Sequence, residues 1–391
     1  MKLGVPKETF PGERRVAVVP AVVPALVKNG IEVVVEPGAG TAAGFPDDMY
    51  TAKGAVLATS RAELFSSADI VVYVRGPGSN TTSGEDDFPL YRKDQVVTGF
   101  LDPLTSPVVA QNMAARGVTA FSMEMIPRIT RAQSMDALSS MATIAGYKAV
   151  LLAADRLPRM FPMLMTAAGT LTAAKVLVVG VGVAGLQAIA TSRRLGAVVQ
   201  AYDVRAAVKE QVQSLGAKFV ELPLDTQQAE GQGGYAAAQS EDFLKRQREL
   251  MGKVIAESDA VITTAAIPGQ KAPILVTTEM VRGMAPGSVV VDIAAERGGN
   301  CELTRPGETV IDGGVTILGP LNIPSEIPYH ASQMYSKNIS ALLQLLVKKG
   351  ELNLDMSDEI IRETMITKGG EVTNPRVRKL LGLPEPVAAG N

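Results

Sequence analysis

The sequence has 391 residues, which at about 150 residues per domain predicts two domains. It is 46% hydrophobic and 20% charged, a composition that builds a buried core and excludes a disordered chain. Lys and Arg (38) nearly balance Asp and Glu (40), and Trp is absent, which argues against nucleic acid as the main partner. A single cysteine, Cys301, and a single histidine, His330, exclude a disulfide framework and a Cys- or His-rich metal centre, and argue against a His-based catalytic triad.

Neither the N-terminus nor the least charged stretch of the chain predicts a targeting or membrane segment. Residues 1–8 lack the apolar run of a signal peptide and the Arg/Ser bias of a transit peptide. Between residues 160 and 192 the only charged residue is Lys175, which leaves uncharged pieces of 15 and 17 residues. Both are shorter than the ~20 apolar residues that a spanning helix needs, so we expect no membrane crossing.

The first 124 residues alternate short apolar runs with helix-like segments. The helix-like segments are 20–29, which ends before Gly30, and 106–116. The apolar runs, which we expect to be strands, are 2–5, 31–36, 70–75, 96–101 and 118–124. Strands that alternate with helices predict a mostly parallel sheet covered on both faces.

A long apolar helix is expected from Asp136 to Leu157, where Pro158 ends it. Because it is apolar on most sides, we interpret it as the connector between two domains. A second α/β series follows, then a last helix over 335–348 and a polar tail. The expected strands of this series are 175–179, 198–203, 218–222, 260–264 and 288–293, with a β-rich piece over 309–318; its expected helices are 185–195, 207–215 and a charged helix that ends near 257.

These elements predict an α/β fold of two Rossmann-like, doubly wound parallel-sheet domains joined by a long helix. Residues 1–136 with 326–391 are expected to form the first domain, whose N-terminal part the C-terminal helix completes. Residues 137–325, connecting helix included, are expected to form the second, Rossmann domain, and a glycine motif within it predicts that this domain binds a dinucleotide.

The strongest local motif is a glycine turn that follows one expected strand and opens one expected helix. It reads Gly180-Val181-Gly182-Val183-Ala184-Gly185, the pattern of a dinucleotide fingerprint. Gly180 permits the tight turn, Gly182 lets a pyrophosphate approach the backbone, and Gly185 lets the helix pack closely on the strand. The helix N-terminus then offers unpaired N–H groups to the phosphates.

Asp203, 23 residues after Gly180, stands at the end of the next expected strand. A carboxylate there can accept hydrogen bonds from the adenosine ribose and repel a 2′-phosphate, which favours NAD(H) over NADP(H). Arg205 can hold a 2′-phosphate instead, or it can be a solvated surface charge. The sequence leaves both roles of Arg205 open.

A second group of polar residues stands in P-R-I-T-R-A-Q-S-M-D, residues 127–136. Thr130 and Gln133 match a capping box, which would explain them as a helix start. Alternatively, Arg128, Gln133 and Asp136 lie at an interdomain cleft, where they hold the carboxamide of nicotinamide and expose one face of its ring for hydride transfer.

Over nearly its whole length the chain resembles the NAD(H)-binding domain I of proton-translocating transhydrogenase. The resemblance is carried by residues 128–140, 163–169, 180–195, 202–206 and 299–301. It implies that the contacts on the nicotinamide side are Arg128, Gln133, Asp136 and Ser139. It implies further cofactor-binding residues, which include Gly180, Gly182, Val183, Ala184, Gly185, Asp203 and Arg205. It also implies that Tyr235 lies on a mobile loop over the nucleotide.

The resemblance also implies partners. Hydride would pass between NAD(H) on this chain and NADP(H) on a partner subunit, and membrane-spanning subunits would couple the exchange to proton translocation. The chain itself is expected to be a homodimer, held peripherally at the cytoplasmic face of the membrane by those subunits.

Alanine dehydrogenase, which shares this fold and the Arg15-Val16-Ala17 pattern, is the main alternative. The resemblance implies that its catalytic lysine matches Arg75 and that its catalytic histidine falls near Asp102, so neither residue type is present where it is expected. Reducing an imine requires a proton donor, whereas hydride transfer between two nicotinamides requires none. A non-catalytic NAD-sensing module is a third possibility. We expect His330 to be structural, Cys301 to be a buried thiol, and Arg15 to be a surface charge or a relic of the shared fold.

Overall fold

The computed structural model describes residues 1–221, 241–266 and 269–384, and it divides into two compact units. The first unit comprises Met1–Met141 and Ser325–Asn391, and the second comprises Ala142–Pro324. The division falls within helix α5 (Ala137–Arg156). The sequence also predicts where two independently folding domains meet. Those domain limits stay a prediction.

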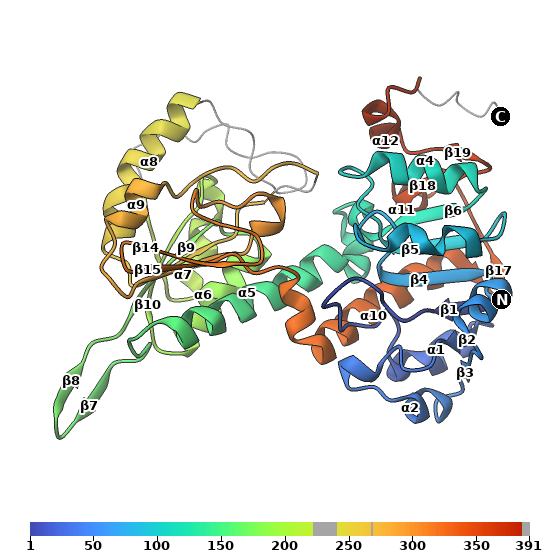
Figure 1. Ribbon diagram of the computed structural model, residues 1–391, viewed down its shortest axis with the longest axis horizontal. Coiled ribbons are helices and arrows are strands. Elements are labelled where there is room, and N and C mark those ends of the chain that lie inside the picture. The colour runs from blue at the N-terminus through green and yellow to red at the C-terminus, as the bar shows by residue number, and fades with distance from the viewer. Residues whose placement is uncertain (222–240, 267–268, 385–391) are drawn as a thin grey trace. The chain divides into compact units, whose positions relative to one another are not determined.

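The first unit is built on an eight-stranded sheet with the order β19-β18-β6-β5-β4-β1-β2-β3 (Figure 1). The six N-terminal strands are all parallel, and β18 and β19 add an antiparallel edge. Strands β4 and β5 are apolar and almost wholly buried, because helices cover both faces of a parallel sheet. The strands are β1 Lys2–Val5, β2 Glu32–Val35, β3 Val56–Leu57, β4 Ile70–Arg75, β5 Val96–Phe100, β6 Thr119–Ser122, β18 Met365–Lys368 and β19 Glu371–Val372, with a separate hairpin of β16 Val347–Lys348 and β17 Glu351–Leu352.

Several helices of this unit begin where a capping side chain or a proline favours a start. Ser60 accepts a hydrogen bond from the Glu63 backbone N–H at the start of α3, and Pro328 occupies the first turn of α10. The α-helices are α1 Val23–Lys28, α2 Asp47–Thr51, α3 Arg61–Ser67, α4 Pro107–Ala115, α10 Pro328–Leu346, α11 Glu359–Thr364 and α12 Pro375–Leu380; the 3-10 helices are η1 Pro20–Val22, η2 Thr41–Ala43, η3 Gly84–Leu90, η4 Met123–Met125, η5 Thr130–Met135 and η9 Ile323–Glu326.

The expected polar tail after residue 348 is wrong. The segment forms α11, the two strands β18 and β19 of the first sheet, and α12. Ile360, Ile361, Met365 and Ile366 are at most 1% exposed, so short apolar pairs supply the core contacts. The strands are too short for their alternation to stand out in the sequence, which is why they were missed.

The second unit has a seven-stranded sheet with the order β11-β10-β9-β12-β13-β15-β14 (Figure 1). Only β14 is antiparallel. The strand order reverses between β9 and β12, which is the switch point beside which doubly wound sheets bind ligands. The strands are β9 Lys175–Val179, β10 Val198–Tyr202, β11 Lys218–Phe219, β12 Ala260–Thr263, β13 Val289–Asp292, β14 Thr309–Asp312 and β15 Val315–Leu318; the helices are α6 Val183–Arg194, α7 Lys209–Ser214, α8 Glu241–Ala256 and α9 Thr278–Arg282, with η6 Ala206–Val208 and η8 Ala295–Arg297.

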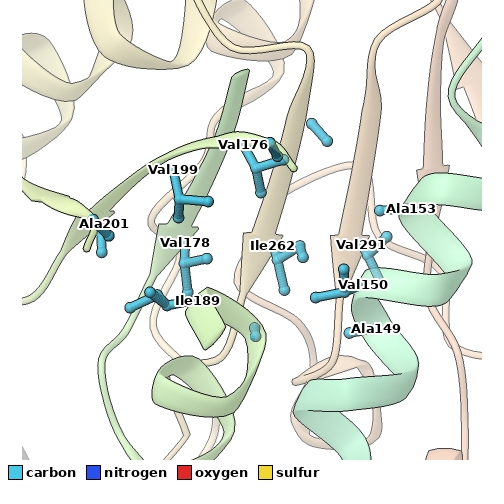
Figure 2. Close-up of a cluster of buried hydrophobic side chains, with 14 of the residues drawn as sticks. Ala149, Val150, Ala153, Val176, Val178, Ile189, Val199, Ala201, Ile262 and Val291 are labelled. Atoms are coloured by element: carbon cyan, nitrogen blue, oxygen red, sulfur yellow. The ribbon is translucent and has the colours of Figure 1, made fainter. Parts of the chain in front are cut away.

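Alternating residues of the strands in this sheet enter two hydrophobic cores. Val176 and Val178 pack with Ala149 and Val150 of α5 and with Ile189 of α6 (Figure 2). On the other face, Leu177 and Val179 pack with residues of α8 and α9. Both faces of the sheet are therefore covered, and the predicted pair of Rossmann-like parallel-sheet folds is confirmed.

The stretch 160–192, notable in the sequence for its low charge, contains strands rather than one long helix. A hairpin of β7 Leu164–Thr166 and β8 Gly169–Leu171 extends away from the rest of the second unit (Figure 1). Among the described residues, one helix, α5, is long and apolar enough to cross a membrane by these measures alone (20 residues, mean hydropathy 1.4), and 39% of its most apolar window is buried in the protein. A core helix of a soluble protein has the same properties.

Candidate functional site

The glycine turn connects β9 to α6 at the carboxyl edge of the second sheet. Gly180 has φ +96°, a conformation that residues with a side chain rarely adopt. A Cβ on Gly185 would lie 1.9 Å from the Gly180 carbonyl oxygen, so only glycine lets α6 approach the turn this closely. A Cβ on Gly182, by contrast, would meet no atom within 4 Å, because this side of the turn faces open space.

Asp203 directly follows β10 and is 8% exposed. Its Oδ2 accepts a hydrogen bond of 2.7 Å from the Val181 backbone N–H, which joins the carboxylate to the glycine turn. Gly180 is held in the same way, since its N–H donates to the Tyr202 carbonyl over 2.8 Å. The turn and the acidic residue are thus fixed relative to each other.

Arg205 pairs with Asp203 at short distance. Its Nε and backbone N–H both donate to Asp203 Oδ1 over 2.9 Å, and its Nη2 donates to Oδ2 over 2.8 Å. The Arg205 side chain is 12% exposed. The interpretation of Arg205 as a solvated surface charge is therefore wrong.

A buried amide supports the loop that follows β12, on the other side of the switch point. Asn300, fully buried, accepts a hydrogen bond from the Ala265 N–H over 3.0 Å and donates to the carbonyls of Ala265 and Pro273 over 2.8 and 2.9 Å. Next to it, Thr264 Oγ1 donates to the Gly180 carbonyl over 2.9 Å. Sequence reasoning missed these hydrogen bonds of Asn300. The G-G-N-C pattern at 298–301 was the one available signal for them.

In the first unit, Arg128, Gln133 and Asp136 line a hollow of about 220 Å³ at the turn η5. Ser139 lies beside it, because its Oγ and backbone N–H donate to the two carboxylate oxygens of Asp136 over 2.6 and 2.8 Å. Helix α10 supports this turn through Asn338, whose Nδ2 donates to the Ser134 carbonyl over 2.8 Å. The structure thus brings these four predicted residues together.

The expected capping box of Thr130 and Gln133 is wrong. The segment is a 3-10 turn whose N-cap is Ile129, and no side chain caps it. The capping residue is Asp136, which accepts the Ser139 N–H at the start of α5. Gln133 is exposed on the hollow and is available to a ligand there.

Arg75 and Asp102, which the sequence comparison with alanine dehydrogenase singled out, have partners within the first unit. Arg75 stacks over the Phe10 ring at 4.3 Å and lies 3.7 Å from the buried Glu13 carboxylate. Glu13 also pairs with Arg15 over 2.6 Å, and Arg15 is 3% exposed, so Arg15 is not a surface charge. Asp102 has φ +46°, and its backbone N–H donates to Glu124 over 2.9 Å.

The pKa values of two carboxyl groups near Arg75 and Asp102 are raised. Burial, together with the nearby Glu13 carboxylate, raises the pKa of Glu8 to about 8. The Glu8 carboxylate accepts the backbone N–H groups of Val74 and Arg75 over 2.6 and 3.0 Å, bonds that limit the rise. Burial also raises the pKa of Glu124 to about 7.

In the part of the chain that the structure describes, Cys301 and His330 belong to no catalytic arrangement. Cys301 is the buried thiol expected, and burial raises its pKa to about 11. His330 is exposed on α10, edge-on to Tyr329 at 5.3 Å. No group of three His, Cys, Asp or Glu among the described residues is placed to hold a metal. Tyr235 and its expected loop lie outside the described residues.

These features suit an adenine dinucleotide. The N-terminus of α6 offers backbone N–H groups beside the open side of Gly182, which a pyrophosphate needs. Asp203 places a carboxylate at the end of the adjacent strand, where dinucleotide-binding sheets carry an acidic residue. The fold and this turn define a two-unit α/β protein of the dinucleotide-binding class.

Comparison with known proteins then gives the family. The alanine dehydrogenase/PNT N-terminal domain matches residues 4–145 and the C-terminal domain matches residues 149–375, so the chain belongs to the alanine dehydrogenase/PNT family. It is 48% identical over 378 residues to an NAD(P) transhydrogenase alpha subunit of Rhodospirillum rubrum, with 96% of this chain and 98% of that protein covered. The predicted resemblance to the transhydrogenase alpha subunit is confirmed.

Two solved structures agree with this result. The transhydrogenase from Sinorhizobium meliloti is 44% identical, has a TM-score of 0.83, and is matched over 96% of this chain and 99% of that chain. An L-alanine dehydrogenase is 25% identical, has a TM-score of 0.79, and is matched over 98% and 99%. The fold shared with alanine dehydrogenase is therefore also confirmed.

The same substitution at Gly185 and at Gly182 should destabilise the protein only at Gly185. Gly185→Ala places a methyl group against the Gly180 carbonyl, so we expect the free energy of unfolding to fall by about 1–3 kcal/mol. Gly182→Ala adds its methyl group to open space at φ −82°, ψ −166°, and should leave stability within about 0.5 kcal/mol of wild type. Urea denaturation followed by circular dichroism measures both, and equal midpoints for the two variants would contradict the close approach at Gly185.

Glu8 should make the protein less stable as pH rises. Its pKa in the folded protein, about 8, exceeds the ordinary value of 4.5, so between these values the folded state binds more protons than the unfolded state. Stability therefore falls as pH rises through this window and is level above it. We expect Glu8→Gln to flatten the decline of Tm between about pH 5 and pH 8. Glu85→Gln, at an exposed position, is the control, and parallel Tm profiles for wild type and Glu8→Gln would refute the assignment.

Proposed function

We propose that this chain is the NAD(H)-binding component of a proton-translocating NAD(P) transhydrogenase. In this function it exchanges hydride between its own NAD(H) and NADP(H) held by a partner subunit. The observation that carries the proposal is the glycine turn, which is open at Gly182 and which the Val181 N–H joins to the Asp203 carboxylate. The identity to transhydrogenase alpha subunits, above 40% over almost the whole chain, supports the same activity.

The adenosine half of the nucleotide belongs, in this proposal, to the glycine turn. The backbone from Gly182 through Val183 and Ala184 receives the pyrophosphate, since this is the first turn of α6. Asp203 accepts hydrogen bonds from the adenosine ribose, while Gly180 and Gly185 give the turn its shape. The negative charge of Asp203 selects NAD(H) over NADP(H).

The nicotinamide half belongs to the hollow lined by Arg128, Gln133 and Asp136. A guanidinium and a carboxamide together match the donors and acceptors of the nicotinamide carboxamide. Ser139 holds the Asp136 carboxylate in one orientation through its two hydrogen bonds. These residues orient the ring, whose C4 supplies or receives the hydride, and orientation of this kind governs the rate. We assign Tyr235 to the same nucleotide.

Hydride exchange between two nicotinamides needs no proton donor, and neither Arg75 nor Asp102 is the lysine or histidine expected for reductive amination. The Arg75 guanidinium stacks on the Phe10 ring and lies 3.7 Å from the Glu13 carboxylate. The Asp102 backbone is tied to Glu124, on a loop with φ +46°. This favours the transhydrogenase reaction over reductive amination, the reaction of the relative named alanine dehydrogenase.

The proposal includes an assembly. NADP(H) is bound by a partner subunit, and membrane-spanning subunits couple hydride exchange to proton translocation. The chain works as a homodimer docked peripherally on those subunits at the cytoplasmic face of the membrane. The relatives are named as alpha subunits, which supports the existence of further subunits.

The test is reconstitution with the NADP-binding component, followed by hydride exchange between NADH and an NADP analogue. We expect exchange, and no oxidation of NADH when pyruvate and ammonia replace the partner. Exchange should slow roughly 10²-fold in Arg128→Ala and Gln133→Ala while NADH binding changes little, because a misplacement of about 1 Å costs this much in rate. Arg131→Ala, which removes only an exposed ion pair with Asp358, is the matched control.

Two other outcomes of these assays would each indicate a different function for the chain. NADH oxidation that depends on pyruvate and ammonia would make the chain an alanine dehydrogenase and overturn the proposal. NADH binding without turnover in either assay would favour a non-catalytic NAD-sensing module.

A further inference from the structure

All the acceptor positions of the Asp203 carboxylate are occupied in this structure. A carboxylate has about four lone-pair positions. Val181 N and Arg205 Nη2 donate to Oδ2, while Arg205 N and Nε donate to Oδ1. Asp203 and Arg205 are also largely buried, with side chains 6% and 12% exposed. A ribose hydroxyl therefore has no acceptor position left on Asp203 while the guanidinium stays in place.

We propose that Arg205 and the adenosine ribose compete for Asp203, so that the nucleotide binds only when the guanidinium leaves the carboxylate. The inference rests on the proposed function, since it concerns the same nucleotide. Arg205 is then a specificity-determining residue whose pairing with Asp203 lowers the affinity for NADH. The bond from the Val181 N–H is not part of the competition, because it holds the carboxylate against the turn from the protein side.

The position of Arg205 is suited to such a movement. It stands at the N-cap of the short turn η6, where its extended backbone (φ −84°, ψ 108°) lies outside regular structure. Its Nη2 also donates to the Val181 carbonyl over 3.2 Å, so the guanidinium bridges the carboxylate and the glycine turn. The pair therefore occupies the surface that joins Asp203 to the turn, where the ribose must bind.

The same geometry has a consequence for the 2′-phosphate of NADP(H). While the pair is closed, the guanidinium neutralises the carboxylate and there is little net charge to repel a phosphate. Once displaced from Asp203, the Arg205 guanidinium stays close to the ribose, and guanidinium groups bind phosphate well. Arg205 thus weakens NADH binding and moderates the rejection of NADPH, so its removal should sharpen the preference for NADH.

Isothermal titration of the full chain with NADH and with NADPH tests this. In Arg205→Ala we expect the Kd for NADH to fall about three- to tenfold, as for loss of one charge-assisted pair. The Kd for NADPH should stay level or rise. Arg205→Gln, which keeps the length of the side chain without its charge, should behave the same way and serves if the alanine variant folds poorly. Arg194→Ala removes one exposed positive charge at the end of α6 and should change neither Kd.

The outcomes separate the inference from the function on which it rests. NADH binding that is unchanged or weaker in both Arg205 variants, with wild type binding normally, overturns the competition and leaves the proposed function intact. Equal gains in Arg194→Ala would show a general charge effect and also overturn it. Failure of wild type and all variants to bind NADH would overturn the proposed function itself.

Discussion

The hydrogen bond from the Val181 N–H to Asp203 Oδ2 is the contact on which the candidate site depends. It joins the turn after β9 to the residue after β10, two segments that a twisted parallel sheet would otherwise leave as separate loops. A buried carboxylate must be satisfied by hydrogen bonds, and here the first donor is the backbone of the glycine turn itself. The proposed acceptor for the ribose and the proposed donors for the pyrophosphate are consequently positioned by one interaction.

Buried polar side chains hold the other loops at this edge of the sheet in the same way, through hydrogen bonds with backbone groups. Loops at the carboxyl ends of strands have irregular backbones, whose N–H and C=O groups need partners when they are buried. Asn300 satisfies three such groups around the loop after β12. Asp292, fully buried, accepts the N–H groups of Asn300 and Cys301. The geometry of the edge therefore comes from a few buried amides and carboxylates, while the apolar cores beneath it supply most of the stability.

Most features set by neighbouring residues could be predicted from the sequence, and features set by distant residues could not. The strands over 70–75 and 175–179 and the glycine turn follow from local pattern, and the structure has them at those positions. The contact of Asn300 with Ala265 spans 35 residues, and β18 pairs with β6 from the other end of the chain. The pairing of Asp203 with Arg205 is local, but nothing in the order of residues showed that the two would fill each other's bonding positions. The predicted capping box of Thr130 and Gln133 is wrong because the same motif also fits a 3-10 turn, which ends at Asp136.

A crystal structure of the chain with bound NADH tests the central claim most directly. The account predicts the pyrophosphate at the first turn of α6 and the adenosine ribose hydroxyls on Asp203, with Arg205 turned away from the carboxylate. It also predicts the nicotinamide ring beside Arg128 and Gln133. A nucleotide bound elsewhere on the chain, or a ribose without contact to Asp203, would contradict it.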